Sequence, residues 1–166
     1  MTSRLPSPED LAKLVSYVFD VMLTLRCELV GRRPVRDGET ARDRLQGLAW
    51  RTAVLPIAGT QPLTVALSSD EPGCLALGAA LFACAQTAVD LEMIDDTLRE
   101  LVNMIGGQVR SAIAKDHSLG LARIDGGEYS NGSSDGHGHG HGPGETRYEC
   151  VVLRAGTFEL AVQVSE

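Results

Sequence analysis

Residues 95–110 read DDTLRELVNMIGGQVR, and the apolar positions in this stretch repeat with the period of an α-helix. At about 100° per residue, the apolar side chains in and beside the stretch fall within one sector roughly 80° wide. They are Ile94, Leu98, Leu101, Ile105, Val109 and Ala112. We expect one helix from about Asp90 to Ala114 that buries this stripe against the rest of the domain.

The opposite side of the same helix carries a group of polar and small residues. Glu100, Asn103 and Gly107 lie within about 60° of one another, and Met104 lies about 40° from Glu100. Gly106 and Gly107 each cost a helix about 1 kcal/mol relative to alanine. Close approach by another surface is the usual compensation. The sequence therefore predicts an exposed patch that combines an acid, a carboxamide and bare backbone.

Length and composition limit the class of protein. The chain has 166 residues, of which 43% are hydrophobic, and we expect one globular domain over residues 7–166. A net charge of −7 argues against nucleic acid or an anionic membrane as the main partner. The four cysteines match no zinc-site spacing, and no apolar run approaches the ~18 residues that span a bilayer. We expect free thiols and a cytoplasmic protein.

The remaining pattern alternates helices with pairs of strands. Ser7 and Pro8 predict a helix start, and Ser68-Ser69-Asp70-Glu71-Pro72 predicts another. The helices should run from Pro8 to between Leu23 and Arg26, and from Pro72 to Gln86. Strands are expected at Cys27–Val30, Leu48–Ile57, Leu63–Leu67, Ser118–Ile124, Glu149–Ala155 and Phe158–Val164. The order α-β-β-β-α-α-β-β-β predicts an α+β fold, a mostly antiparallel sheet with helices packed on it.

Three features of this pattern carry further expectations. Trp50 alternates with apolar neighbours and should pack inside the domain, and Pro56 suggests an edge or an irregular finish for its strand. The charged segment Arg32–Arg44 is either a solvated loop or a binding patch. Residues 125–145 are rich in Gly, Ser and His and should form a flexible loop. Its alternating His137, His139 and His141 are either low-complexity sequence or weak candidates for a metal site.

The spacing Glu100-x-x-Asn103 is the main candidate for chemistry. Glu100 can pair with a cation on a partner or act as an acid or base. Asn103 offers both an acceptor and donors, so it can orient a water molecule. On spacing alone, an ordinary solvated helix face is the favoured explanation of the same residues.

The stretch Glu100-Leu-Val-Asn103-Met-Ile-Gly-Gly107 resembles the E-x-x-N-(M/I)-I-x-G signature of the CheX/CheC family of bacterial chemotaxis phosphatases. The order of predicted elements around it is similar to a CheX-like domain, over roughly residues 8 to 124 and 146 to 165. The motif occurs once, which resembles the single-site CheX type more than the duplicated CheC type. The resemblance implies a CheC-like fold.

That resemblance also implies a function. It suggests a phosphatase for the aspartyl phosphate of a CheY-type response regulator, in chemotaxis or other two-component signalling. Glu100 would dock to the regulator's lysine and Asn103 would orient the attacking water, while Asp96, Met104 and Gly107 would contact the partner. The chain would need no cofactor of its own, since the Mg²⁺ belongs to the regulator. A non-catalytic CheX-like module that binds a regulator or signalling scaffold is the alternative, and a homodimer is implied for either.

Overall fold

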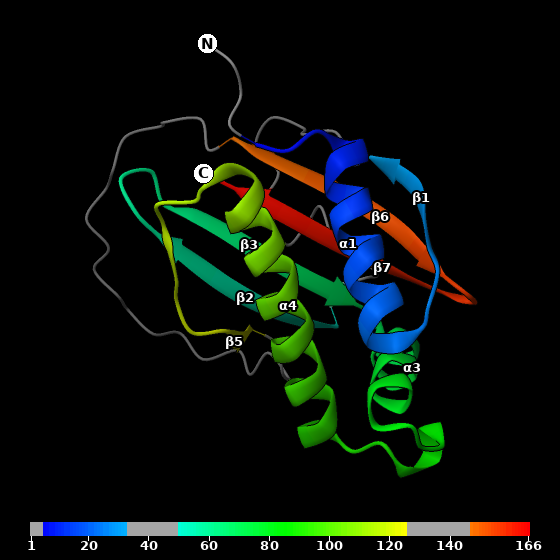
Figure 1. Cartoon of the computed structure of the whole chain (residues 1–166). Coiled ribbons are helices and arrows are strands. Elements are labelled where there is room, and N and C mark those ends of the chain that lie inside the picture. The colour runs from blue at the N-terminus through cyan, green and yellow to red at the C-terminus, as the bar shows by residue number, and fades with distance from the viewer. Residues whose placement is uncertain (1–4, 33–49, 126–146) are drawn as a thin grey trace, which may run out of the picture.

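A computed structural model describes residues 5–32, 50–125 and 147–166, which form a seven-stranded sheet covered by helices on one face (Figure 1). The elements are α1 (Pro8–Leu23), β1 (Cys27–Arg32), β2 (Arg51–Ala58), β3 (Leu63–Ser69), α3 (Glu71–Phe82), the 3₁₀ turn η1 (Gln86–Ala88), α4 (Leu91–Ile113), β4 (Ser118–Leu119), β5 (Arg123–Asp125), β6 (Tyr148–Ala155) and β7 (Phe158–Ser165). Strands pair in the order β1-β6-β7-β3-β2-β4, with β5 beside β2, and every pairing is antiparallel. The α+β prediction is confirmed.

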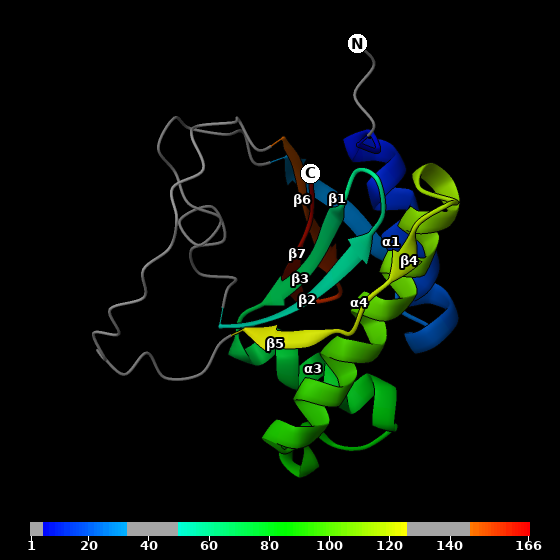
Figure 2. The same ribbon diagram turned by 90° about the vertical axis from the view of Figure 1, so that its left-hand side faces the viewer.

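Figure 2, turned by 90°, shows the helices and the sheet as two layers. Leu11, Val15 and Phe19 of α1 are fully buried, as are Leu98 and Leu101 of α4. These side chains share one core with the sheet residues that face them. The buried stripe predicted for α4 is confirmed except at Ala112, which is exposed on the last turn.

The helices α1 and α4 each begin directly after a side chain that caps their first turn. The Ser7 hydroxyl accepts a hydrogen bond from the Asp10 N–H at 3.1 Å, and the Asp90 carboxylate accepts one from the Met93 N–H at 2.8 Å. Both helices therefore begin where the sequence predicts. The start of α3 is different, because Asp70 alone is its cap and Ser68 and Ser69 are the last, fully buried residues of β3.

Two further boundaries correct the sequence-based expectation. The helix α3 ends at Phe82 rather than Gln86, because Ala83 adopts a left-handed backbone with φ of 50° and turns the chain away. The strand β2 begins at Arg51, so Trp50 precedes it instead of alternating within it. Trp50 is 38% exposed, and its ring lies 5.7 Å from the Arg51 guanidinium carbon.

The strand expected at Ser118–Ile124 is split into β4 and β5, and Pro56 explains the break. Residues 118–119 pair with Ala58 and Ile57, and residues 123–125 pair with Val54, Ala53 and Thr52. Between them, the Pro56 carbonyl accepts a hydrogen bond from the Gly120 N–H at 2.8 Å. Because the N–H and C=O of one residue point to the same side of an antiparallel strand, proline removes the donor that would continue this ladder.

The C-terminal hairpin is confirmed, and the first strand is slightly longer than expected. β6 and β7 form the expected hairpin, and Gly156 in its turn has a φ of 61°. β1 extends two residues beyond Val30, with a register shift between Leu29 and Gly31. Asp125 ends β5, whereas residues 126–145 of the expected loop and most of Arg32–Arg44 lie outside the described residues. No helix among the described residues has the length and hydropathy of a membrane span.

Candidate functional site

The outward face of α4 carries the residues that the sequence singled out. Glu100 and Asn103 are both exposed, and Met104 and Gly107 beside them are partly exposed. Within the described ranges, neither the Glu100 carboxylate nor the Asn103 carboxamide has a hydrogen-bond or ion-pair partner. The structure therefore brings the predicted pair together, one turn apart, with both polar groups available to another molecule.

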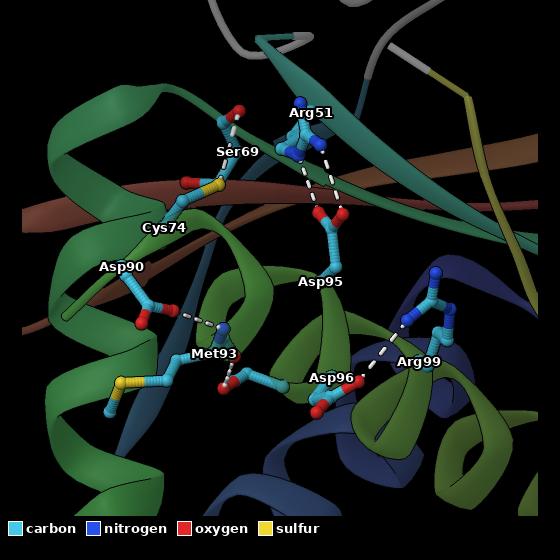
Figure 3. Close-up of polar contacts among 9 residues, drawn as sticks. Arg51, Ser69, Cys74, Asp90, Met93, Asp95, Asp96 and Arg99 are labelled. Atoms are coloured by element: carbon cyan, nitrogen blue, oxygen red, sulfur yellow. Dashed lines mark hydrogen bonds and ion pairs between the residues drawn. The ribbon is translucent and has the colours of Figure 1, made fainter. Parts of the chain in front are cut away.

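The same face is acidic toward the start of the helix. Glu92, Asp96 and Glu100 are spaced four residues apart, and all three are exposed. Carboxylates at this spacing lie above one another on one side of a helix. Asp96 differs from Glu100 in having a partner, because Arg99 Nη1 lies 3.2 Å from its Oδ1 (Figure 3). The face is a negatively charged ridge that favours a cationic partner group.

The two glycines of α4 lie in different surroundings. A methyl group built on Gly106 would stand 2.1 Å from Leu55 Cδ2, so the side chain of β2 occupies that space. A methyl built on Gly107 would meet nothing within 4 Å. The close approach expected of these glycines is therefore found at Gly106, against the sheet, while Gly107 keeps the exposed face open.

On the side of α4 that faces β2, Asp95 makes a bidentate ion pair with Arg51 (Figure 3). Arg51 Nε donates to Oδ1, and Nη2 donates to Oδ2 at 2.9 Å. The two side chains are only 11% and 18% exposed, and the hydrogen bond to Asp95 raises the pKa of the arginine further. Sequence reasoning missed this pair. Its signals were a lone arginine at the start of an apolar strand and the acid that precedes Asp96.

The cysteines confirm the expectation of free thiols, since none forms a disulfide. Cys74 lies close to the ion pair, with its Sγ 3.8 Å from the Ser69 carbonyl (Figure 3). Burial raises the pKa of Cys74 to about 12 and that of Cys27 to about 11. A thiol with so high a pKa is protonated at neutral pH and is a poor nucleophile. Neither group is equipped for covalent chemistry beside the ridge.

The histidines give no metal site in the part of the chain that the structure describes. No group of three or more His, Cys, Asp or Glu side chains gathers there. His117 is buried, and its Nε2 lies 2.8 Å from the Gln61 carbonyl oxygen. The ring is therefore hydrogen-bonded to the turn between β2 and β3. His137, His139 and His141 lie outside the described residues.

Comparison with known proteins supports the fold through structure alone. No protein-family model matches the sequence, and no curated protein does either. The chemotaxis protein CheX from Desulfovibrio desulfuricans is similar with a TM-score of 0.67 and 16% identity, covering 94% of this chain and 96% of that one. A chemotactic CheC-like protein from Shewanella oneidensis MR-1 has a TM-score of 0.67 and 13% identity, with full coverage of both chains.

A third similar structure is a complex. CheX from Borrelia burgdorferi, solved with CheY, BeF₃ and Mg²⁺, gives a TM-score of 0.65 at 16% identity and covers 95% of each chain. At these identities the likeness shows the fold. The chain has the fold of a CheX-like domain, as the resemblance implied.

Proposed function

We propose that this CheX-like chain binds a CheY-type response regulator and accelerates hydrolysis of the regulator's aspartyl phosphate. The observation that carries the proposal is the Glu100–Asn103 pair, which is exposed and without partners in the described chain, on the side of α4 opposite its buried stripe. A similar fold solved in complex with CheY, BeF₃ and Mg²⁺ supports the choice of partner. The setting is bacterial chemotaxis or another two-component pathway.

Asn103 would orient the water that attacks phosphorus. Hydrolysis of an acyl phosphate needs a water molecule in line with the bond that breaks, and the rest is positioning and charge stabilisation. A carboxamide accepts a hydrogen bond from that water and can donate one to a phosphoryl oxygen. Since the group is neutral, it does not repel the negatively charged phosphoryl group as a carboxylate would.

Glu100 would fix the orientation of the complex by pairing with the regulator's lysine. Its carboxylate lies one turn from Asn103, and the neighbouring acids of the ridge add to the negative potential. Asp96, Met104 and Gly107 would form the surrounding contact surface, where a polar rim and an adaptable methionine suit a protein partner. The Mg²⁺ in this proposal is held by the regulator.

The test is phosphate release from a CheY-type regulator of the same genome, phosphorylated with acetyl phosphate in the presence of Mg²⁺. The parent protein should accelerate release, and Asn103→Ala should reduce the acceleration by at least ~100-fold while its circular dichroism spectrum is unchanged. Release at the parent rate by Asn103→Ala would refute the mechanism. A parent protein that binds the regulator without accelerating release would establish the alternative, a non-catalytic binding module.

A further inference from the structure

The helix α4 is held against β2 at two points, one on each side of the Glu100–Asn103 pair. We propose that the residues at these two points, Arg51 with Asp95 and Leu55 with Gly106, are positioning residues for the pair. They hold the helix at the depth and rotation that aim Asn103 at the attacking water. This inference rests on the proposed function and extends it to groups that never touch the partner.

The first anchor is the ion pair between Arg51 and Asp95. Two parallel hydrogen bonds join the guanidinium fork to both carboxylate oxygens, so the geometry fixes direction as well as distance. Both side chains are largely shielded from water, which strengthens their attraction and restricts their rotamers. The centroid of the Trp50 ring lies 5.7 Å from the carbon of the same guanidinium, within the range of a cation–π interaction. The N-terminal half of α4 is thereby tied to the first residue of β2.

The second anchor is steric. Leu55 Cδ2 lies 2.1 Å from the place where a Gly106 side chain would begin, and Leu119 Cδ2 lies 3.8 Å from it. Glycine therefore lets the helix backbone rest on a fully buried leucine of β2. Any larger residue must displace Leu55 or lift the helix away from the sheet.

The two anchors lie along matching directions on the helix and the strand. From Asp95 to Gly106 the helix rises by about 16 Å, and from Arg51 to Leu55 the strand advances by about 13 Å. Glu100 and Asn103 fall between the anchored positions. A helix fixed at both ends of this interval can neither slide nor roll without breaking one anchor. Such restraint matters because an error of 1 Å in a reacting group can reduce a rate by ~100-fold.

The first experiment removes the charge of Asp95 while keeping its shape. For Asp95→Asn, kcat for phosphate release should fall by about tenfold, whereas KM for the phosphorylated regulator changes by less than about threefold. The reason is that the long Glu100 side chain can still reach a lysine after a small shift, but an in-line water cannot adjust. Glu159→Gln is the matched control. It removes one charge from the exposed Arg154–Glu159 pair on the β6–β7 hairpin, an ion pair that does not involve α4, and its kinetics should match the parent.

The second experiment tests the steric anchor by rescue. Gly106→Ala should also lower kcat by about tenfold with little change in KM. Adding Leu55→Val removes the atom that blocks the new methyl and leaves the leucine γ position 3.5 Å away, an ordinary contact. The double variant should recover kcat to within about threefold of the parent. A merely structural role would change the folded fraction, which circular dichroism at the assay temperature measures, and would leave kcat per folded molecule at the parent value.

Hydrogen exchange of the free protein separates this inference from the proposed function. Amides of residues 98–105 should exchange faster in Asp95→Asn and Gly106→Ala than in the parent and in Glu159→Gln. If Asn103→Ala loses activity but both anchor variants keep the parent kcat, the positioning role is wrong and the function stands. If the parent itself is inactive, the function is wrong. In that case unchanged exchange in both variants overturns the anchors as well.

Discussion

The polar side chains of α4 lie in two contrasting environments, one that faces β2 and one that faces outward. Asp95 is matched by Arg51 with two hydrogen bonds and is mostly shielded from water. Glu100 and Asn103, five and eight residues further along the helix, are exposed and have no partner in the described part of the chain. The difference is one of direction, because Asp95 points to the sheet and the other two point away from it.

This contrast separates stability from function on one helix. A charge that is paired inside the domain contributes to folding, and its removal leaves the other charge poorly solvated. An exposed polar group with no internal partner contributes little to folding. Its side chain is free to bind something else. If the contrast holds, substitutions at the Arg51–Asp95 pair should change stability most, and substitutions at Glu100 and Asn103 should change binding or catalysis without changing stability.

The largest effect on stability is expected for Asp95→Ala. Because the variant leaves the Arg51 guanidinium without its carboxylate in a site where that side chain is 11% exposed, the free energy of unfolding should fall by about 3 kcal/mol. Asn103→Ala is the control and should stay within ~0.5 kcal/mol of the parent. Urea denaturation followed by circular dichroism measures both. Equal stabilities for the two variants would remove the distinction between the pairs.

The next effect is on binding rather than folding. Glu100→Ala should weaken binding to a CheY-type regulator by about tenfold, or ~1.4 kcal/mol, because it removes one ion pair to the partner. Calorimetry with the regulator loaded with Mg²⁺ and beryllofluoride measures the affinity. The difference from the parent should shrink as salt is raised. An unchanged affinity would show that the partner binds elsewhere on the chain.

Sequence reasoning found α4 and its exposed face because both follow from local rules. The apolar period, the Asp90 cap and the Glu100-x-x-Asn103 spacing are properties of a single helix and need no knowledge of the fold. The same rules placed α1 and the final hairpin. They misplaced Ala112, which is exposed although Val109 and Ile113 of the same turn pack against the core.

The missed features depend on contacts between distant segments. Arg51 and Asp95 are 44 residues apart, so their pairing follows only from how α4 lies on β2. The break between β4 and β5 depends on a proline in the neighbouring strand rather than on their own sequence. The early end of α3 depends on a left-handed Ala83, a conformation that alanine rarely adopts. None of these features follows from the sequence of one segment alone.

The adjacent glycines offer a smaller but sharper comparison. Gly107→Ala adds a methyl group in open space and should raise the free energy of unfolding by about 1 kcal/mol through helix propensity. Gly106→Ala should lose that gain, because its methyl group collides with Leu55. Thermal unfolding of the two single variants measures the difference. If both stabilise the protein equally, Leu55 moves aside freely and the steric anchor is weak.

The smallest effect is expected for Asp96, which shares the exposed ridge with Glu100 but already has a partner. Its carboxylate lies 3.2 Å from Arg99, and the two side chains are 58% and 43% exposed. An exposed i,i+3 pair contributes only about 0.3 kcal/mol to stability, so Asp96→Asn should barely change unfolding and its effect should vanish in high salt.

Regulator binding should follow the same reasoning. Because Arg99 competes for the Asp96 carboxylate, Asp96→Asn should weaken binding by about twofold, well below the effect of Glu100→Ala. Calorimetry on Asp96→Asn, Arg99→Gln and the double variant separates the two roles of the acid. If Arg99→Gln tightens binding and the tightening requires Asp96, the Arg99–Asp96 ion pair competes with binding of the partner to the Asp96 carboxylate. If Asp96→Asn instead weakens binding as much as Glu100→Ala, an internal partner does not distinguish structural from functional acids on this helix.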